Sequence, residues 1–262
     1  MPQPLDNSWT HFISQNPNAK LRLFCFHYSG GNANIFNTWA QFIPNEIELC
    51  AIQLPGRMDL MHLNPFQQFD EVIQPLCEQL LPYLRDKPFV FFGHSLGALL
   101  GYSLSHYLLE NHHITPRGLM IAACASPSVR KSGEPIHLLP ENAFIEKLSS
   151  YHSEDNSEVR QLFENREFMQ LMLPILRADF ALSATYKYVK KQPFDFPIFA
   201  YGGDKDPQVS PDEITAWHIE TTNTFEYSMF DGDHFFTKKQ QETFLKTLIS
   251  HLQEGMVGLG LV

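Results

Sequence analysis

A serine, with a glycine two positions away on either side, stands at the centre of the pentapeptide Gly93-His94-Ser95-Leu96-Gly97. The pentapeptide follows the apolar run PFVFF and opens an expected helix that continues as ALLGYSLSHYLLE. A strand-turn-helix arrangement of this kind exposes a serine hydroxyl above a sheet, because glycine has no Cβ that would clash in the sharp turn. The helix N-terminus also directs backbone N–H groups towards developing negative charge. The pattern therefore predicts that Ser95 is a nucleophile rather than a serine that only caps a helix.

A serine hydroxyl is a weak nucleophile at neutral pH and needs a general base. Where this turn occurs, the order along the chain is serine, then an acid, then histidine. Three histidines follow a possible acid late in the chain, namely His218, His234 and His251. His218 and His251 fall within expected helices, whereas His234 lies in the loop DGDHFF between the last expected strand and the last expected helix. We therefore predict that His234 is the general base.

Two aspartates compete for the role of the acid. The segment CASPSVRKSG, which follows the strand after the serine turn, contains no carboxylate, but the next strand, FPIFAY, runs into GGDKDP. The G-x-x-D spacing of hydrolases with this serine turn favours Asp206, and Pro207 fixes the turn beyond it; Asp204 is the alternative. The acid would hold the imidazole in the correct tautomer and stabilise the imidazolium that forms.

An oxyanion formed at the serine needs two backbone N–H donors. One is the N–H of Leu96, the residue after the nucleophile. We assign the other to Ser29, with Tyr28 as the alternative, in the loop HYSGG after the first expected strand. This loop lacks the Lys-Ser/Thr pair of a phosphate-binding P-loop. His27, at the start of the loop, is expected to support it structurally.

Short apolar runs alternate with longer segments of helical periodicity, which predicts an α/β fold with a mostly parallel central sheet flanked by helices. Continuous apolar runs such as LFCF and FVFF are typical of strands that helices cover on both faces. The expected strands are Leu21–Tyr28, Ile47–Leu54, Pro88–Phe92, Gly118–Ala123, Phe196–Tyr201 and Thr224–Phe230.

The helical segments fall between these strands. Helices are expected over Phe69–Leu84, Ser95–Glu110 and Lys238–Gln253, with a further helix that starts at the capping box after Ser210. Residues 134–191 contain no convincing strand, only helical segments such as Ala143–Tyr151 and Val159–Val189. We interpret them as a helical lid inserted into a single domain of residues 1–262, the alternative being an ordinary pair of packing helices.

Composition narrows the class of protein. The chain has 262 residues, of which 44% are apolar and 18% charged, enough for a sizeable core. Its formal charge of −10 argues against binding to nucleic acid. The N-terminal segment has no features of a secretory signal, and no apolar run could span a bilayer, so we expect a cytoplasmic protein without membrane contact. The cysteines have no metal-site spacing and are expected to be buried thiols: Cys25, Cys50, Cys77 and Cys124.

Several motifs, in order along nearly the whole chain, resemble those of the type II thioesterases. These are the stand-alone editing hydrolases of polyketide and nonribosomal peptide synthesis, in the α/β-hydrolase superfamily. The motifs are FHYSGGNA from Phe26, QLPGR ending at Arg57, GHSLGALLGY from Gly93, LRADF from Leu176, GGDKDP from Gly202 and DGDHFF from Asp231.

The resemblance implies an α/β-hydrolase fold in which residues 134–191 form the mobile lid. It also implies a substrate, an acyl group on the phosphopantetheine arm of an acyl carrier or peptidyl carrier protein. We expect no cofactor and no metal. A free-standing carboxylesterase or acyl-CoA thioesterase is the alternative, which a preference for thioesters over oxygen esters would separate. An intact Ser/Asp/His set argues against a catalytically inactive binding module.

Three charged residues outside the Ser/Asp/His set have two alternative interpretations. Arg57, Arg177 and Asp179 either bind anionic parts of the partner or hold the fold together. Because the resemblance implies an acidic carrier and this chain is itself an anion, any attraction would need a local basic patch. The candidates are Arg130-Lys131 and the cluster Lys187, Lys190 and Lys191, which alternatively only solvate the ends of helices.

Overall fold

The computed structural model describes residues 8–131, 135–151, 157–258 and 260. In this part of the chain, seven strands form one sheet in the order β1-β3-β2-β4-β5-β6-β7. Only β1 is antiparallel, to β3; the other pairs are parallel, which confirms the expected sheet. The strands are β1 (Thr10–Ser14), β2 (Leu21–Phe26), β3 (Ile47–Ile52), β4 (Phe89–His94), β5 (Leu119–Ala122), β6 (Ile198–Gly203) and β7 (Phe225–Phe230).

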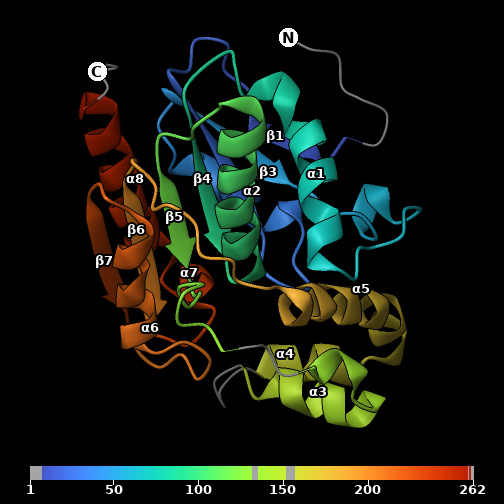
Figure 1. Ribbon diagram of the computed structural model, residues 1–262. Helices are drawn as coiled ribbons and strands as arrows, with labels where there is room; N and C mark the ends of the chain where they lie inside the picture. Colours follow the sequence, from blue (N-terminus) through green and yellow to red (C-terminus); the bar gives the residue numbers. More distant parts are fainter. Residues whose placement is uncertain (1–7, 132–134, 152–156, 259, 261–262) are drawn as a thin grey trace.

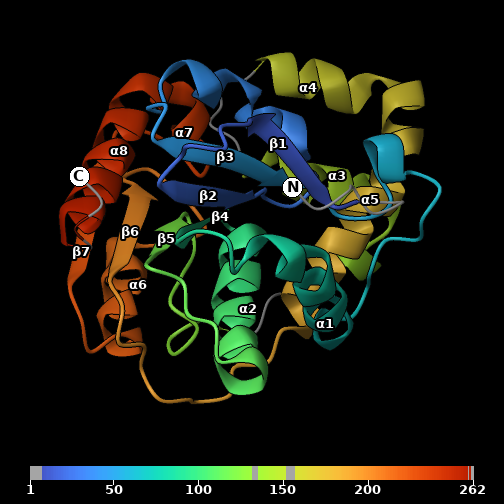
Figure 2. The same cartoon turned by 90° about the horizontal axis from the view of Figure 1, so that it is seen from above.

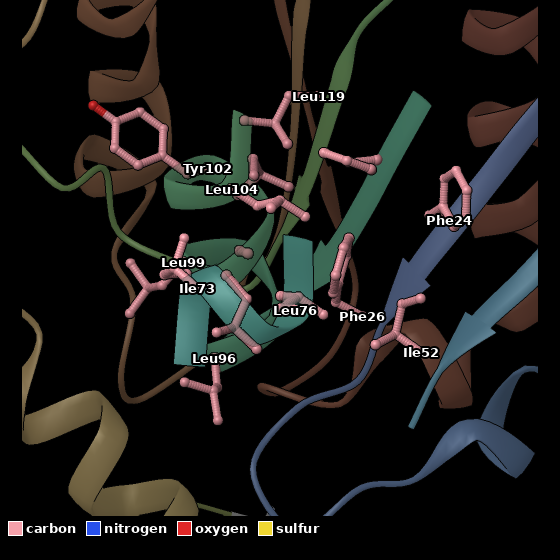
Figure 3. Packing of buried hydrophobic residues seen from close by; sticks show 14 of the residues in the cluster. Phe24, Phe26, Ile52, Ile73, Leu76, Leu96, Leu99, Tyr102, Leu104 and Leu119 are labelled. Atoms are coloured by element: carbon pink, nitrogen blue, oxygen red, sulfur yellow. The ribbon is translucent and has the colours of Figure 1, made fainter. Parts of the chain in front are cut away.

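The central strands are apolar on both faces because helices cover both (Figure 2). Along β4, Phe89 and Phe91 belong to one core cluster, whereas Val90 and Phe92 belong to another. Helices α1 (Phe69–Leu80) and α2 (Leu96–His112) pack on the first face, as the close view of this core shows (Figure 3). The 3₁₀ helix η1 (Ala33–Gln41) and helix α8 (Gln241–Gly258) cover the second. The period of two along a strand thus explains the continuous apolar runs.

Several element boundaries differ from those expected. The first helix ends as α1 at Leu80 and continues as the 3₁₀ turn η3 (Leu81–Tyr83), and the last one follows a short helix, α7 (Phe236–Lys239). The capping box expected at Ser210 is present and opens α6 (Pro211–Thr215), followed by η5 (Ala216–Glu220). The remaining 3₁₀ turn is η2 (Met58–Leu60).

The segment between β5 and β6 is helical, as expected. It contains the 3₁₀ turn η4 (Ile136–Leu138) and the helices α3 (Glu141–Ser149), α4 (Ser157–Glu164) and α5 (Arg166–Thr185), which gather at one end of the sheet (Figure 1). We call this segment the insertion. The expected helix Val159–Val189 is wrong as one element: it is broken at Asn165, whose side chain accepts a hydrogen bond from the N–H of Phe168 and caps α5. Glu134, the expected start of the insertion, lies outside the described residues.

The insertion has its own small core, to which Phe144, Leu148 and Leu176 contribute. Helix α5 also joins the main core, because its Leu182 packs in the cluster beneath α1 and α2. One face of α5 therefore belongs to the body of the molecule and another to the insertion.

The four cysteines are buried and unpaired with one another, which confirms the prediction of buried thiols. Within the described ranges, no group of His, Cys, Asp or Glu side chains could hold a metal ion. No helix among these residues combines the length and apolar character needed to cross a membrane.

Candidate active site

Ser95 stands in the sharp turn between β4 and α2, with φ +54° and ψ −112°. A residue with a side chain rarely adopts a positive φ, and such strain persists only where the surroundings hold it. One restraint is a hydrogen bond of 2.8 Å from the Ser95 N–H to the carbonyl oxygen of Ala122, at the end of β5. The neighbouring strand thus helps to fix the orientation of the serine.

The glycines of the pentapeptide allow the backbone to pack closely here. A Cβ at Gly93 would lie 2.3 Å from the carbonyl oxygen of Gly97, and a Cβ at Gly97 would lie 2.3 Å from that of Phe26 in β2. Both distances are shorter than any van der Waals contact, so neither position can hold a side chain. The sequence pattern G-x-S-x-G therefore follows from packing.

His234 and Asp206 form a buried pair. The Nδ1 atom of His234 lies 2.8 Å from Oδ2 of Asp206, and the two side chains are 5% and 0% exposed. Because a carboxylate oxygen only accepts, Nδ1 carries the proton and donates it, and in the neutral imidazole Nε2 is then the acceptor. The other oxygen of Asp206 accepts the N–H of Gln208 at 2.8 Å, which further orients the carboxylate.

Asp204, the other candidate acid, has a different position. Its Oδ1 accepts the backbone N–H of Gly232 at 3.0 Å, and the N–H of Lys205 donates to the Gly232 carbonyl at the same distance. These bonds tie the loop after β7 to the loop after β6. Asp204 therefore holds the backbone near His234. Among the described residues, no hydrogen bond joins its carboxylate to the ring of His234.

The loop HYSGG forms a tight turn next to this pair. The N–H of Gly31 donates to the carbonyl of Tyr28 at 2.9 Å, and Gly30 has φ +78°, as the third residue of a type II turn requires. The N–H of Gly30 donates to Oδ2 of Asp179 in α5 at 2.7 Å. Both glycine N–H groups thus have partners, whereas the hydrogen bonds among the described residues include none from the amides of Tyr28 and Ser29. Both residues line the same cavity as Ser95.

A buried ion pair stabilises the turn at Gly30 and Gly31. The Arg57 guanidinium contacts both carboxylate oxygens of Asp179, at 2.7 and 2.6 Å, and donates to the carbonyl of Gly31 at 2.9 Å. Arg57 is 4% exposed and Asp179 1% exposed, so neither is placed to meet a partner protein. Arg177 donates to the backbone of His137 and lies over the ring of Phe144. Of the two interpretations for these three residues, the structure supports the one in which they hold the fold.

We expect Asp179→Asn to destabilise the protein by about 3 kcal/mol, because removing one partner leaves a buried guanidinium without its counter-charge. Urea unfolding followed by circular dichroism measures the loss. Glu167→Gln is the matched control, since Glu167 is an exposed carboxylate of the same helix. Equal stability of the two variants would contradict the importance of the Arg57–Asp179 pair.

Two further histidines lie next to the site and are held neutral. Burial lowers the pKa of His27 to about 4, and its Nδ1 lies 2.8 Å from the carbonyl of Tyr28. Burial also lowers the pKa of His94 well below its usual value, and its Nδ1 lies 3.1 Å from the hydroxyl of Thr237. The His94 ring packs edge-on against His234, with 5.5 Å between ring centroids. His27 thus fits the supporting role expected from the sequence, and His94 forms part of the wall behind His234.

Ser95 and His234 open into one cavity of about 460 Å³, within the usual range for ligand sites. The insertion supplies much of its wall, including Ile136, Phe180 and Ser183. Sequence reasoning missed these lining residues, and also His94, although its place inside the pentapeptide could have drawn attention to it. The cavity places the predicted nucleophile, base and loop donors around one space under the insertion.

Comparisons with known proteins agree with this geometry. Residues 21–252 match the family model for the thioesterase domain. The chain is 35% identical to the gramicidin S biosynthesis protein GrsT of Aneurinibacillus migulanus, with 94% of each chain covered. The structure of BorB, a type II thioesterase from the borrelidin biosynthetic cluster, matches with a TM-score of 0.80 and 30% identity over 95% of this chain and all of BorB. These similarities support the α/β-hydrolase fold over nearly the whole chain.

A further relative is named as an enzyme of another class, a dehydrogenase. The chain is 36% identical to the linear gramicidin dehydrogenase LgrE of Brevibacillus parabrevis, over 95% of this chain and 94% of that protein. The G-x-G-x-x-G fingerprint of a dinucleotide-binding turn is nevertheless absent from the present sequence, and the turn after its first parallel strand reads HYSGGN. The family match over residues 21–252 includes the whole site described above. The chain belongs to the thioesterase domain family.

Proposed function

We propose that the protein hydrolyses thioesters through an acyl-enzyme on Ser95, with His234 as general base and Asp206 as the acid that orients it. The observation that carries the proposal is the shared cavity. The strained Ser95 opens into the same space as His234, whose Nδ1 atom is hydrogen-bonded to the buried carboxylate of Asp206. This arrangement of nucleophile, base and orienting acid is that of serine hydrolases on several unrelated folds.

In the first half-reaction, Nε2 of His234 takes the Ser95 proton as Oγ attacks the thioester carbonyl carbon. The tetrahedral intermediate collapses, the carbon–sulfur bond breaks, and the imidazolium returns the proton to the leaving thiolate. A water molecule then repeats the attack on the acyl-enzyme with His234 again as base, which releases the carboxylic acid and restores Ser95. Asp206 stabilises the imidazolium in both halves.

The negative charge on the carbonyl oxygen needs donors that are already in place. We assign the N–H of Leu96, which lies in the first turn of α2 and has no partner within that helix, and the N–H of Ser29. The Arg57–Asp179 pair and the Gly30 N–H hold the turn that carries Ser29. Helix α5 thus positions one of the two donors.

The substrate we propose is an acyl group on the phosphopantetheine arm of an acyl carrier or peptidyl carrier protein, removed as an editing step in the cytoplasm. Support comes from GrsT and BorB, which are named for gramicidin S and borrelidin biosynthesis. The insertion over the cavity would act as the lid of a single domain, residues 1–262, that admits the arm. No cofactor is required by this chemistry.

We expect acyl-carrier and acyl-pantetheine thioesters to be hydrolysed with a much higher kcat/KM than oxygen esters with the same acyl group. The measurement compares one short acyl chain on a carrier protein, on coenzyme A, on pantetheine and as its ethyl ester. The free carboxylic acid is quantified in every case. A preference for the ethyl ester would instead identify a carboxylesterase, and a preference for the coenzyme A ester over the carrier would contradict the carrier as partner.

A further inference from the structure

A second cavity, of about 280 Å³, opens beside the first. Its walls are Pro127, Arg130, Lys131, Tyr186, Lys187 and Tyr188, and we call it the cationic pocket. These residues come from the segment after β5 and from the segment after α5. Arg130 and Lys131 line both cavities, so the cationic pocket adjoins the space that contains Ser95.

The charge of this pocket opposes that of the whole chain. Three of its lining residues are cations and none is an acid, in a protein of formal charge −10. Among the described residues, neither Lys131 nor Lys187 has a carboxylate within ion-pair distance. Two lysine charges are therefore available to an anion at the edge of the catalytic cavity.

Arg130 is held in place between the two cavities. Its Nη2 donates to the carbonyl of Ser183 in α5 at 3.2 Å, and its own N–H donates to the carbonyl of Ser126 at 2.9 Å. The guanidinium has further N–H groups beyond this one bond. Among the described residues, a guanidinium with N–H groups that make no hydrogen bond lies beside two lysines without an ion pair, an arrangement suited to an oxyanion such as a phosphate.

The remaining lysines of the cluster expected from the sequence do not share this position. Lys191 forms an ion pair of 2.7 Å with Glu110, on α2. Lys190 is exposed and lines neither cavity. The five cations considered from the sequence thus separate into three that line one pocket and two that lie outside it.

We propose that the cationic pocket binds the phosphate of the phosphopantetheine arm while the thioester at the other end of the arm reaches Ser95. The inference rests on the proposed function. The arm carries one phosphate, at the end attached to the carrier, and its remaining length is uncharged. An anion site that adjoins the catalytic cavity would therefore fix the arm at its only charged point.

The test uses one acyl group on four leaving groups: pantetheine, phosphopantetheine, coenzyme A and the carrier protein. We expect Lys131→Gln/Lys187→Gln to lower kcat/KM for the phosphopantetheine, coenzyme A and carrier substrates, which all contain the phosphorylated arm, by about ten- to hundredfold more than for pantetheine, since charge-assisted hydrogen bonds to phosphate are lost. Lys190→Gln is the matched control, and its preference for the phosphorylated arm should equal that of the unchanged protein.

Three other patterns of loss in kcat/KM would overturn the inference. A loss confined to the carrier substrate would show that the lysines contact the carrier's surface, and a loss confined to coenzyme A would show that they bind its nucleotide phosphates. An equal loss on pantetheine would make the effect one of folding or chemistry. Calorimetric binding of phosphopantetheine and pantetheine to the same variants is a readout independent of turnover. Tighter binding of phosphopantetheine that needs the two lysines would support the pocket even if every thioester were left intact, an outcome that would refute the proposed function alone.

Discussion

Replacing Ser95 by alanine is expected to abolish thioester hydrolysis while the protein remains folded. Loss of the nucleophile of a serine hydrolase costs roughly 10⁶ in kcat. The backbone at this position should not change, because alanine and serine meet the same strain at φ +54° and the N–H bond to Ala122 stays. Steady-state hydrolysis, with circular dichroism as the check on folding, measures the effect.

Covalent labelling tests the same prediction. A serine-directed phosphonate should add once to the intact protein, at Ser95, and should not react with Ser95→Ala. Ser250→Ala, an exposed serine on α8, is the matched control and should be labelled and active like the unchanged protein. An adduct at another residue, or normal turnover by Ser95→Ala, would refute Ser95 as the nucleophile.

Asp206→Asn is expected to cost roughly 10⁴ in kcat, because the amide can donate to Nδ1 of His234 and so favour the wrong tautomer. Asp204→Asn should cost about tenfold or less, since an asparagine oxygen can still accept the N–H of Gly232. The two variants remove the same charge from the same loop, so each is the control for the other. Measuring kcat on one thioester decides between them, and a larger loss in Asp204→Asn would reverse the assignment.

The sheet could be predicted from the sequence because its central strands are apolar on both faces. Strand β1, with the sequence THFIS, was missed since it is a half-buried edge strand whose register shifts between Phe12 and Ser14. The 3₁₀ helix η1 was missed as well, because its apolar residues Phe36 and Trp39 follow a three-residue period that is short and weak. Edge and 3₁₀ elements depend on neighbours that a single segment does not reveal.

The site was predictable to the extent that its chemistry is local in sequence. The pentapeptide around Ser95 carries its own packing requirements. By contrast, the sequence left Arg57 and Asp179 with two roles each, because their partners stand 122 positions apart. The choice between Asp204 and Asp206 likewise rests on which carboxylate reaches the ring of His234, a matter of tertiary position. The sequence also does not show which cations of the basic cluster line the cationic pocket, because this depends on the path of the chain after α5.

The turn at Ser95 has a consequence for how the enzyme acquires activity as it folds. Its strained φ is held by a bond to the end of β5, Gly97 packs against the backbone of β2, and His234 lies in the loop after β7. Pairing between strands distant in sequence is slow, because loop closure must precede the contacts that reward it. Intermediates that lack β7 would contain the serine without its base. Turnover should therefore recover during refolding only after β2, β4, β5 and β7 have all assembled, and later than the helical signal.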